Sequence, residues 1–120
     1  MEYKMIQEKL TVLKTAAIID DAVYEYIQAV IVYLEEKGLI EDSQKAEVFL
    51  THLAMASARQ QKGESVNELD KVIRDEIKTE VQFGDAKILW QELAELAPVT
   101  FHENEIDYLY LHICTMLAKI

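Results

Sequence analysis

Glycine, proline and cysteine are scarce in this chain: three, one and one, respectively, in 120 residues. An all-β fold needs turn residues at about every tenth position, so this scarcity excludes an all-β fold and predicts a mainly helical one. The single cysteine, Cys114, has no partner for an internal disulfide, and the N-terminus lacks the pattern of a signal peptide. Both features predict a cytoplasmic protein.

Positive charge is scarce as well. Twelve basic residues stand against 22 acidic ones, for a formal net charge of −10, and neither half of the chain is basic. Direct binding to nucleic acid, which requires a basic surface to neutralise phosphates, is therefore not expected. No apolar stretch approaches the roughly 20 residues of a membrane-spanning helix, so no membrane association is expected either.

The composition, 51% hydrophobic and 28% charged, is typical of a globular protein. A chain of this length buries roughly two-thirds of its unfolded surface, enough for one core without disulfides or a structural metal. We therefore expect a single domain over residues 1–120, built around one hydrophobic core.

Apolar residues recur with helical spacing and predict a bundle of about six helices. Gly38 and Pro98 close two of these helices. Two capping-box patterns, Ser65-x-x-Glu68 and Thr100-x-x-Glu103, are expected to open helices. The first predicted helix covers residues 2–15, the second runs from a cap at Asp20-Asp21 to Gly38, and the third covers about 44–61. The fourth begins at the Ser65 capping box and has Leu69, Val72, Ile73 and Ile77 as its apolar positions. A break at Phe83-Gly84-Asp85 separates it from a fifth helix that ends before Pro98, and the sixth begins at the Thr100 capping box.

Two of the three histidines hold matching positions on their predicted helices. His52 lies about 100° from the centre of the apolar stripe of its helix, and His112 lies about 100° from the centre of the stripe of the last helix. Arg59 follows His52 by seven residues and Glu105 precedes His112 by seven, so each histidine shares a helix face with a charged residue. Tyr108 lies one turn before His112.

These positions suit two interpretations. A neutral imidazole at the edge of an apolar stripe is a competent nucleophile, and Arg59 would neutralise the oxygens of a transferred phosphoryl group. Glu105 would orient the imidazole of His112 or repel a bound phosphate. Equally, a histidine at a helix interface is often only a hydrogen-bonded structural residue. Spacing alone leaves both interpretations open.

A family resemblance bears on this choice. The stretch from Phe49 to Gly63, with His52 followed by Arg59 and a glycine, resembles the histidine-containing helix of phosphotransferase-system regulation domains (PRDs). The stretch 103–113 resembles the second histidine motif of that family, and segments 65–69 and 80–84 resemble its connecting segments. The resemblance covers residues 20–118, so residues 1–19 would be an N-terminal helical extension.

The resemblance implies an all-α regulatory domain and not an enzyme. It marks His52 and His112 as phosphorylation sites, with Arg59, Glu105 and Tyr108 supporting them. The implied phosphoryl donor is a phosphocarrier or an enzyme II component of the bacterial phosphotransferase system, and a homodimer is expected. Because 120 residues leave no room for an attached effector module, a stand-alone domain would influence transcription through a separate effector protein.

Two other functions are weighed against this hypothesis. One is a helical adaptor that keeps the fold but is not phosphorylated and serves only protein contacts or dimerisation. The other is a metal-dependent enzyme using the histidines with Glu103 or Glu105, but no known metal motif is present, and we expect neither catalytic residues, metal nor cofactor. Cys114 is turned about 200° from His112 on the helix, so a small buried thiol is expected there.

Overall fold

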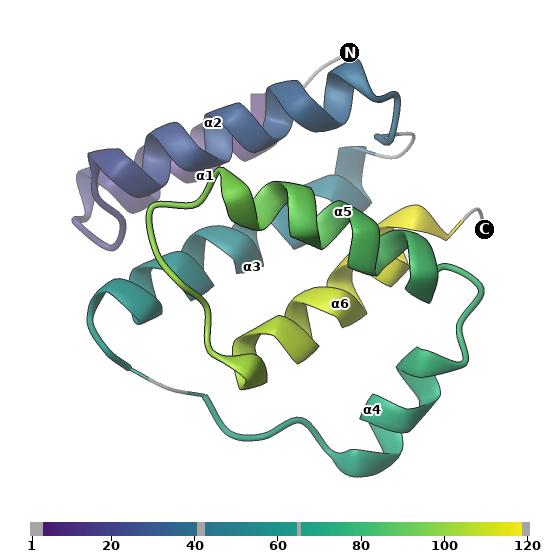
Figure 1. Cartoon of the computed structure of the whole chain (residues 1–120). Coiled ribbons are helices and arrows are strands. Elements are labelled where there is room, and N and C mark those ends of the chain that lie inside the picture. Colours follow the sequence, from purple (N-terminus) through teal and green to yellow (C-terminus); the bar gives the residue numbers. More distant parts are fainter. Residues whose placement is uncertain (1–3, 41–42, 65, 119–120) are drawn as a thin grey trace.

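The computed structural model describes residues 4–40, 43–64 and 66–118. Within these ranges the chain forms six helices and no strand (Figure 1). The helices are α1 (Lys4–Thr15), α2 (Asp21–Glu36), α3 (Ser43–Gln61), α4 (Lys71–Lys78), α5 (Phe83–Glu95) and α6 (Glu103–Leu117). The prediction of an all-α bundle is confirmed.

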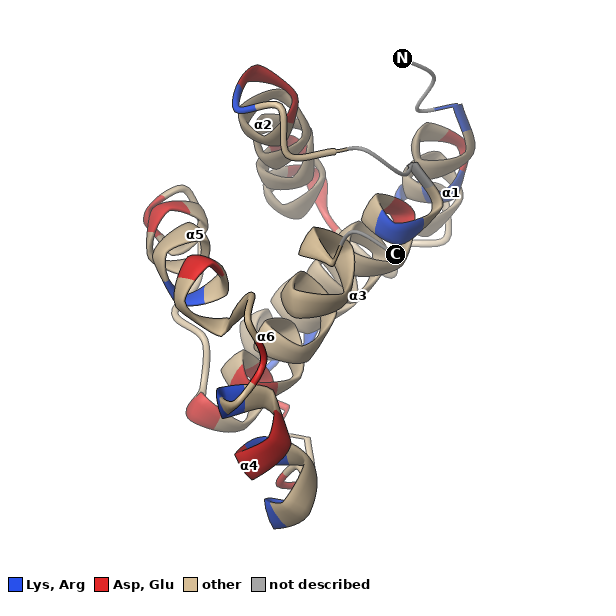
Figure 2. Cartoon of the chain, turned by 90° about the vertical axis from the view of Figure 1, so that its right-hand side faces the viewer, with Lys and Arg blue, Asp and Glu red and all other residues tan. Residues whose placement is uncertain are grey.

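The helices α3 and α6 form the centre of the bundle and run antiparallel to each other (Figure 1). Figure 2 shows α1 and α2 on one side of this pair and α4 at the opposite end, with α5 flanking α6. The apolar faces of α3 and α6 supply much of the core, including the fully buried Phe49, Leu53, Leu109 and Ile113. The packing of these side chains fixes how the facing sides of α3 and α6 lie against each other.

The predicted boundaries of α2 are confirmed by its caps. The Asp20 side chain accepts a hydrogen bond of 2.9 Å from the amide of Val23, which satisfies one of the free amides at the helix start. At the other end, Gly38 has a φ of 66°, a left-handed conformation that glycine adopts without a steric penalty. Both signals are local, which is why the sequence alone was sufficient to predict them.

The predicted start of α4 is wrong. Ser65 lies outside the described residues, and residues 66–70 are not helical. The helix begins at Lys71, because Asp70 caps it by accepting a hydrogen bond of 2.8 Å from the amide of Val72. The predicted apolar stripe is also only half correct: Leu69 and Ile77 are buried, but Val72 and Ile73 are 64% and 39% exposed. This short helix packs mainly on α6, so one narrow side of it is covered.

The starts of α5 and α6 also differ from the predictions. The chain breaks before Phe83 and not at the Phe83-Gly84-Asp85 segment, which already lies in the first turn of α5. At α6 the cap is His102, not Thr100: the Nδ1 atom of His102 accepts a hydrogen bond of 3.1 Å from the amide of Asn104. A ring nitrogen thus fills the role predicted for a hydroxyl.

The N-terminal helix α1 joins the same core as the rest of the chain. Ile6 and Leu10 are buried, and α1 packs on both α2 and α3. Gln7 of α1 and Gln28 of α2 also share a side-chain hydrogen bond of 2.9 Å. Glu2, the predicted first residue of this helix, lies outside the described residues. No helix in the described parts of the chain has the length and apolar character needed to cross a membrane.

Candidate functional site

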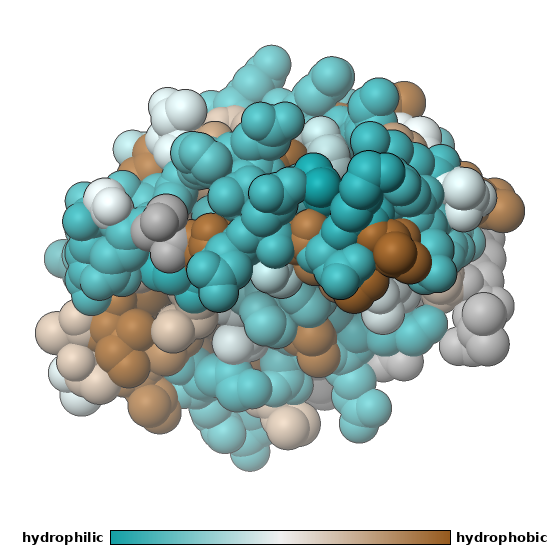
Figure 3. Space-filling model, turned by 90° about the horizontal axis from the view of Figure 1, so that it is seen from below, coloured by the Kyte–Doolittle hydropathy of each residue, from teal (hydrophilic) through white to brown (hydrophobic). Residues whose placement is uncertain are grey.

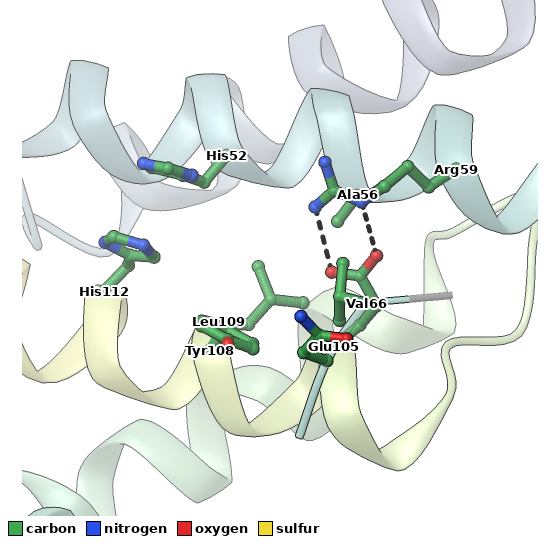
Figure 4. A pocket seen from close by; sticks show the side chains of 9 residues that line it. His52, Ala56, Arg59, Val66, Glu105, Tyr108, Leu109 and His112 are labelled. Carbon is green, nitrogen blue, oxygen red and sulfur yellow. Dashed lines mark hydrogen bonds and ion pairs between the residues drawn. The ribbon is translucent and has the colours of Figure 1, made fainter. Parts of the chain in front are cut away.

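The two predicted site histidines meet across the α3–α6 contact. The ring centroids of His52 and His112 lie 3.9 Å apart, and the ring planes differ by only 13°, so the imidazoles are stacked (Figure 4). His52 is exposed and His112 is half-buried. The sequence predicted that each histidine lies at the edge of the apolar stripe on its helix, but it contained no signal that these two edges face each other.

The charged residues two turns away also meet, but they bind each other. The guanidinium of Arg59 donates two hydrogen bonds to the carboxylate of Glu105, of 2.7 Å from Nε and 3.0 Å from Nη2. Glu105 is 1% exposed, whereas the Arg59 side chain is 31% exposed. Such a two-pronged ion pair provides the partners that a buried carboxylate needs. Glu105 also lies in the first turn of α6, where the helix dipole favours a negative charge.

Antiparallel packing explains both pairs together. Along α3 the histidine comes first and the arginine seven residues later, whereas along α6 the glutamate comes first and the histidine seven residues later. Seven residues make about two helical turns, so each pair shares a face. When α3 and α6 run in opposite directions, the register that stacks His52 on His112 also sets Arg59 opposite Glu105.

A cavity of about 510 Å³ runs between the stacked rings and the ion pair. Tyr108 lines this cavity, together with Ala56 and Leu109 (Figure 4). Two further lining residues, Val66 and Asn67, come from the segment between α3 and α4. Sequence reasoning compared that segment with a family connection but did not assign it to the site, because its contact with α6 is non-local. The side-chain Nδ2 of Asn104 donates a hydrogen bond of 3.4 Å to the carbonyl of Val66 and helps to hold the segment there.

The surroundings of both imidazoles favour the neutral form. Burial, and to a smaller extent the neighbouring His52, together lower the pKa of His112 to about 4. The pKa of His52 is also lowered, first by burial and then by the positive charges of Arg59 and Lys9. Near neutral pH both rings therefore carry a nitrogen lone pair, which is the state required for nucleophilic attack.

A second cavity, of about 310 Å³, reaches His112 away from the ion pair and is lined by Gln44, Lys45, Val48 and Thr115. The ammonium of Lys45 donates a hydrogen bond of 2.9 Å to the carbonyl of Ala118. His112 therefore lines both cavities.

The remaining candidate ligands lie elsewhere. Cys114 is a buried free thiol whose pKa is raised by burial, in agreement with the role expected for it. Within residues 4–40, 43–64 and 66–118, no three side chains of His, Cys, Asp and Glu gather closely enough to hold a metal ion.

Comparison with known proteins identifies the family. Neither the curated proteins nor the solved structures include a significant match. A family model, that of the PRD domain, matches residues 25–115, which is most of the chain and contains both stacked histidines and the ion pair. The helical architecture agrees with this match, and the chain belongs to the PRD domain family, the regulation domains of the phosphotransferase system.

Proposed function

We propose that this chain is a regulatory domain in which His52 and His112 accept phosphoryl groups. The donor is a phosphocarrier protein or an enzyme II component of the phosphotransferase system. One observation carries the proposal: two neutral imidazoles from different helices are stacked 3.9 Å apart, one of them exposed, beside an open cavity. A purely structural histidine does not need this access.

The reaction is a transfer between nitrogens. A neutral imidazole nitrogen of this chain attacks the phosphorus of a donor phosphohistidine, so one N–P bond forms as the donor N–P bond breaks. The other nitrogen of the acceptor releases its proton to water, and the donor imidazole takes one up. The Arg59–Glu105 pair holds α3 and α6 in the register that presents the two rings.

Phosphorylation changes the charge at the centre of the bundle. A phosphoryl group adds a charge of about −1.5 to −2 where two neutral rings are in contact. A charged group of this size beside the stacked rings changes the shape and the charge of the α3–α6 surface. A surface altered in this way would switch contacts with a second copy of the chain or with an effector protein that acts on transcription.

The test is labelling of the purified full chain with phosphoenolpyruvate, enzyme I, the phosphocarrier protein and an enzyme II component, read by intact mass at alkaline pH, where phosphohistidine is stable. Wild type should gain phosphate, and a His52→Gln/His112→Gln double variant should gain none. His102→Gln is the matched control, because His102 lies at the α6 cap and not in the site, and it should label like wild type. An unlabelled wild type, under conditions that label a known PRD, refutes the proposal.

A second candidate is the adaptor that is never phosphorylated. The observation that favours it is that Arg59 and Glu105, the charged residues predicted to support the histidines, bind each other instead. In that case the His52→Gln and His112→Gln variants should keep the oligomeric state of wild type in light-scattering measurements, with and without the labelling mixture. The phosphoryl-acceptor hypothesis instead expects the labelling mixture to change the mass of the wild-type assembly, since a homodimer is the expected partner state.

A further inference from the structure

We infer that the stacked histidines are a single acceptor: each chain carries one phosphoryl group, on His52 or on His112, and never both. The inference rests on the proposed function, since it concerns how the same site is filled. It follows from the distance between the two rings, the charge of a phosphoryl group and the existing ion pairs and hydrogen bonds of the nearby cationic side chains.

Ring stacking limits the space for two groups. The imidazoles lie one over the other, with ring centroids 3.9 Å apart and ring planes that differ by 13° (Figure 4). A phosphoryl group bonded to a ring nitrogen has its phosphorus in the ring plane and its oxygens on both sides of it. Groups on both rings would therefore compete for the gap between the two planes.

Charge repulsion acts in the same direction. Each phosphoryl group carries about −1.5 to −2. At a separation of about 5 Å, the repulsion between two such groups lowers double occupancy by at least tenfold to a hundredfold even with the dielectric constant of bulk water, and by more in a partly buried site. His112 is half-buried, so the stronger repulsion applies.

The cations described around the pair are already engaged. Arg59 binds Glu105, Lys9 binds Glu47 at 2.9 Å, and Lys45 donates to the carbonyl of Ala118. To form an ion pair with one of these cations, a phosphoryl group would have to displace the partner that the cation already has. A second group would require a further displacement in a chain whose net charge is already −10.

The stack also argues against a relay between the histidines. The lone pair of an imidazole nitrogen lies in the plane of its ring, so in parallel rings it does not point at a phosphorus held by the other ring. In-line attack from His52 to phospho-His112 is therefore not available in this arrangement. Each histidine receives its phosphoryl group from the external donor.

The face of the molecule seen in Figure 3 is mostly hydrophilic, with hydrophobic residues in limited patches. Access to the two histidines depends on the burial of each side chain. A donor is expected to approach the exposed His52 more easily than the half-buried His112. Faster labelling of His52 than of His112 would agree with the two sites being filled separately.

The experiment is exhaustive labelling of wild type, His52→Gln and His112→Gln, read by intact mass and by fragment mapping. We expect each single variant to gain one phosphate, and wild type to gain one as well, divided between the two histidines on different molecules. Doubly phosphorylated wild type as the main product, or failure of either single variant to label while folded by circular dichroism, overturns the inference but leaves phosphorylation itself standing. Absence of any label on wild type refutes the proposed function instead.

A matched pair of variants separates charge from the loss of a ring. His52→Glu places a negative charge beside His112, and His52→Gln has nearly the same shape without the charge. If repulsion excludes the second group, labelling of His112 should be at least about tenfold slower in the glutamate variant than in the glutamine variant. Equal rates would overturn the inference.

Discussion

Replacing Arg59 with methionine keeps most of the side-chain volume but leaves the carboxylate of Glu105 buried without its two hydrogen bonds. Removing one partner of a fully buried ion pair costs about 3–5 kcal/mol. Because 31% of the Arg59 side chain is exposed, water screens part of the pair. We therefore expect Arg59→Met to lower the free energy of unfolding by about 2–4 kcal/mol.

Urea denaturation at pH 7 measures this loss, and in a chain of 120 residues each kcal/mol also lowers the melting temperature by roughly 4 °C. The control is the double variant Arg59→Met/Glu105→Leu, which removes both charges. Replacing a buried ion pair by apolar residues is often close to neutral, so the double variant should recover most of the stability. If instead the double variant loses as much as the two single variants added together, the stranded charge is not the cause and the reasoning is refuted.

Three further predictions concern pH, the core and a cap. Burial holds the pKa of His112 near 4 in the folded chain, against the ordinary value of 6.5 expected in the unfolded chain. Between pH 6.5 and 4 the unfolded chain therefore binds a proton at this residue more readily than the folded chain does. On acidification from pH 6.5 to 4, the free energy of unfolding should fall by about 1–2 kcal/mol after allowance for solvent screening. Urea titrations should show a smaller fall in His112→Gln, and an equal fall contradicts the assignment. Tyr26→Phe deletes a buried hydrogen bond of 2.9 Å to the carbonyl of Leu93 and should cost about 1 kcal/mol in urea denaturation; no loss would show that the bond contributes nothing. Asp20→Ala removes the α2 cap and should cost about 1 kcal/mol by the same assay, whereas Asp21→Ala, at an exposed ion pair with Lys14, should change stability by less than about half as much.

The accuracy of the sequence predictions follows the range of the interactions involved. Helix α2 was predicted well because Asp20 and Gly38 act on their own neighbours along the chain. The start of α4 was predicted wrongly because the capping-box pattern at Ser65 was taken as the start of the helix, and the role of Asp70 as the cap was missed. The exposure of Val72 was missed for a different reason: helical spacing identifies an apolar face, but not whether another helix covers it.

The same difference between local and non-local interactions applies to the candidate site. Local sequence determined that His52 and Arg59 share one face of their helix and that Glu105 and His112 share one face of theirs, because the helical repeat alone sets these positions. The expectation that Arg59 would serve the histidine on its own helix did not anticipate its pairing with Glu105. Which residues meet across helices depends on direction and register, and neither is encoded within a single helix.

The sequence by itself thus determined a helical PRD chain with two histidines at the edges of apolar stripes, through composition, helical period and family motifs. Only the tertiary structure decided that these histidines stack and that a buried ion pair lies beside them. The physical reason is that Phe49 and Leu53 of α3 pack with Leu109 and Ile113 of α6 in one hydrophobic core. That non-local burial sets the antiparallel register, and the register brings both pairs together.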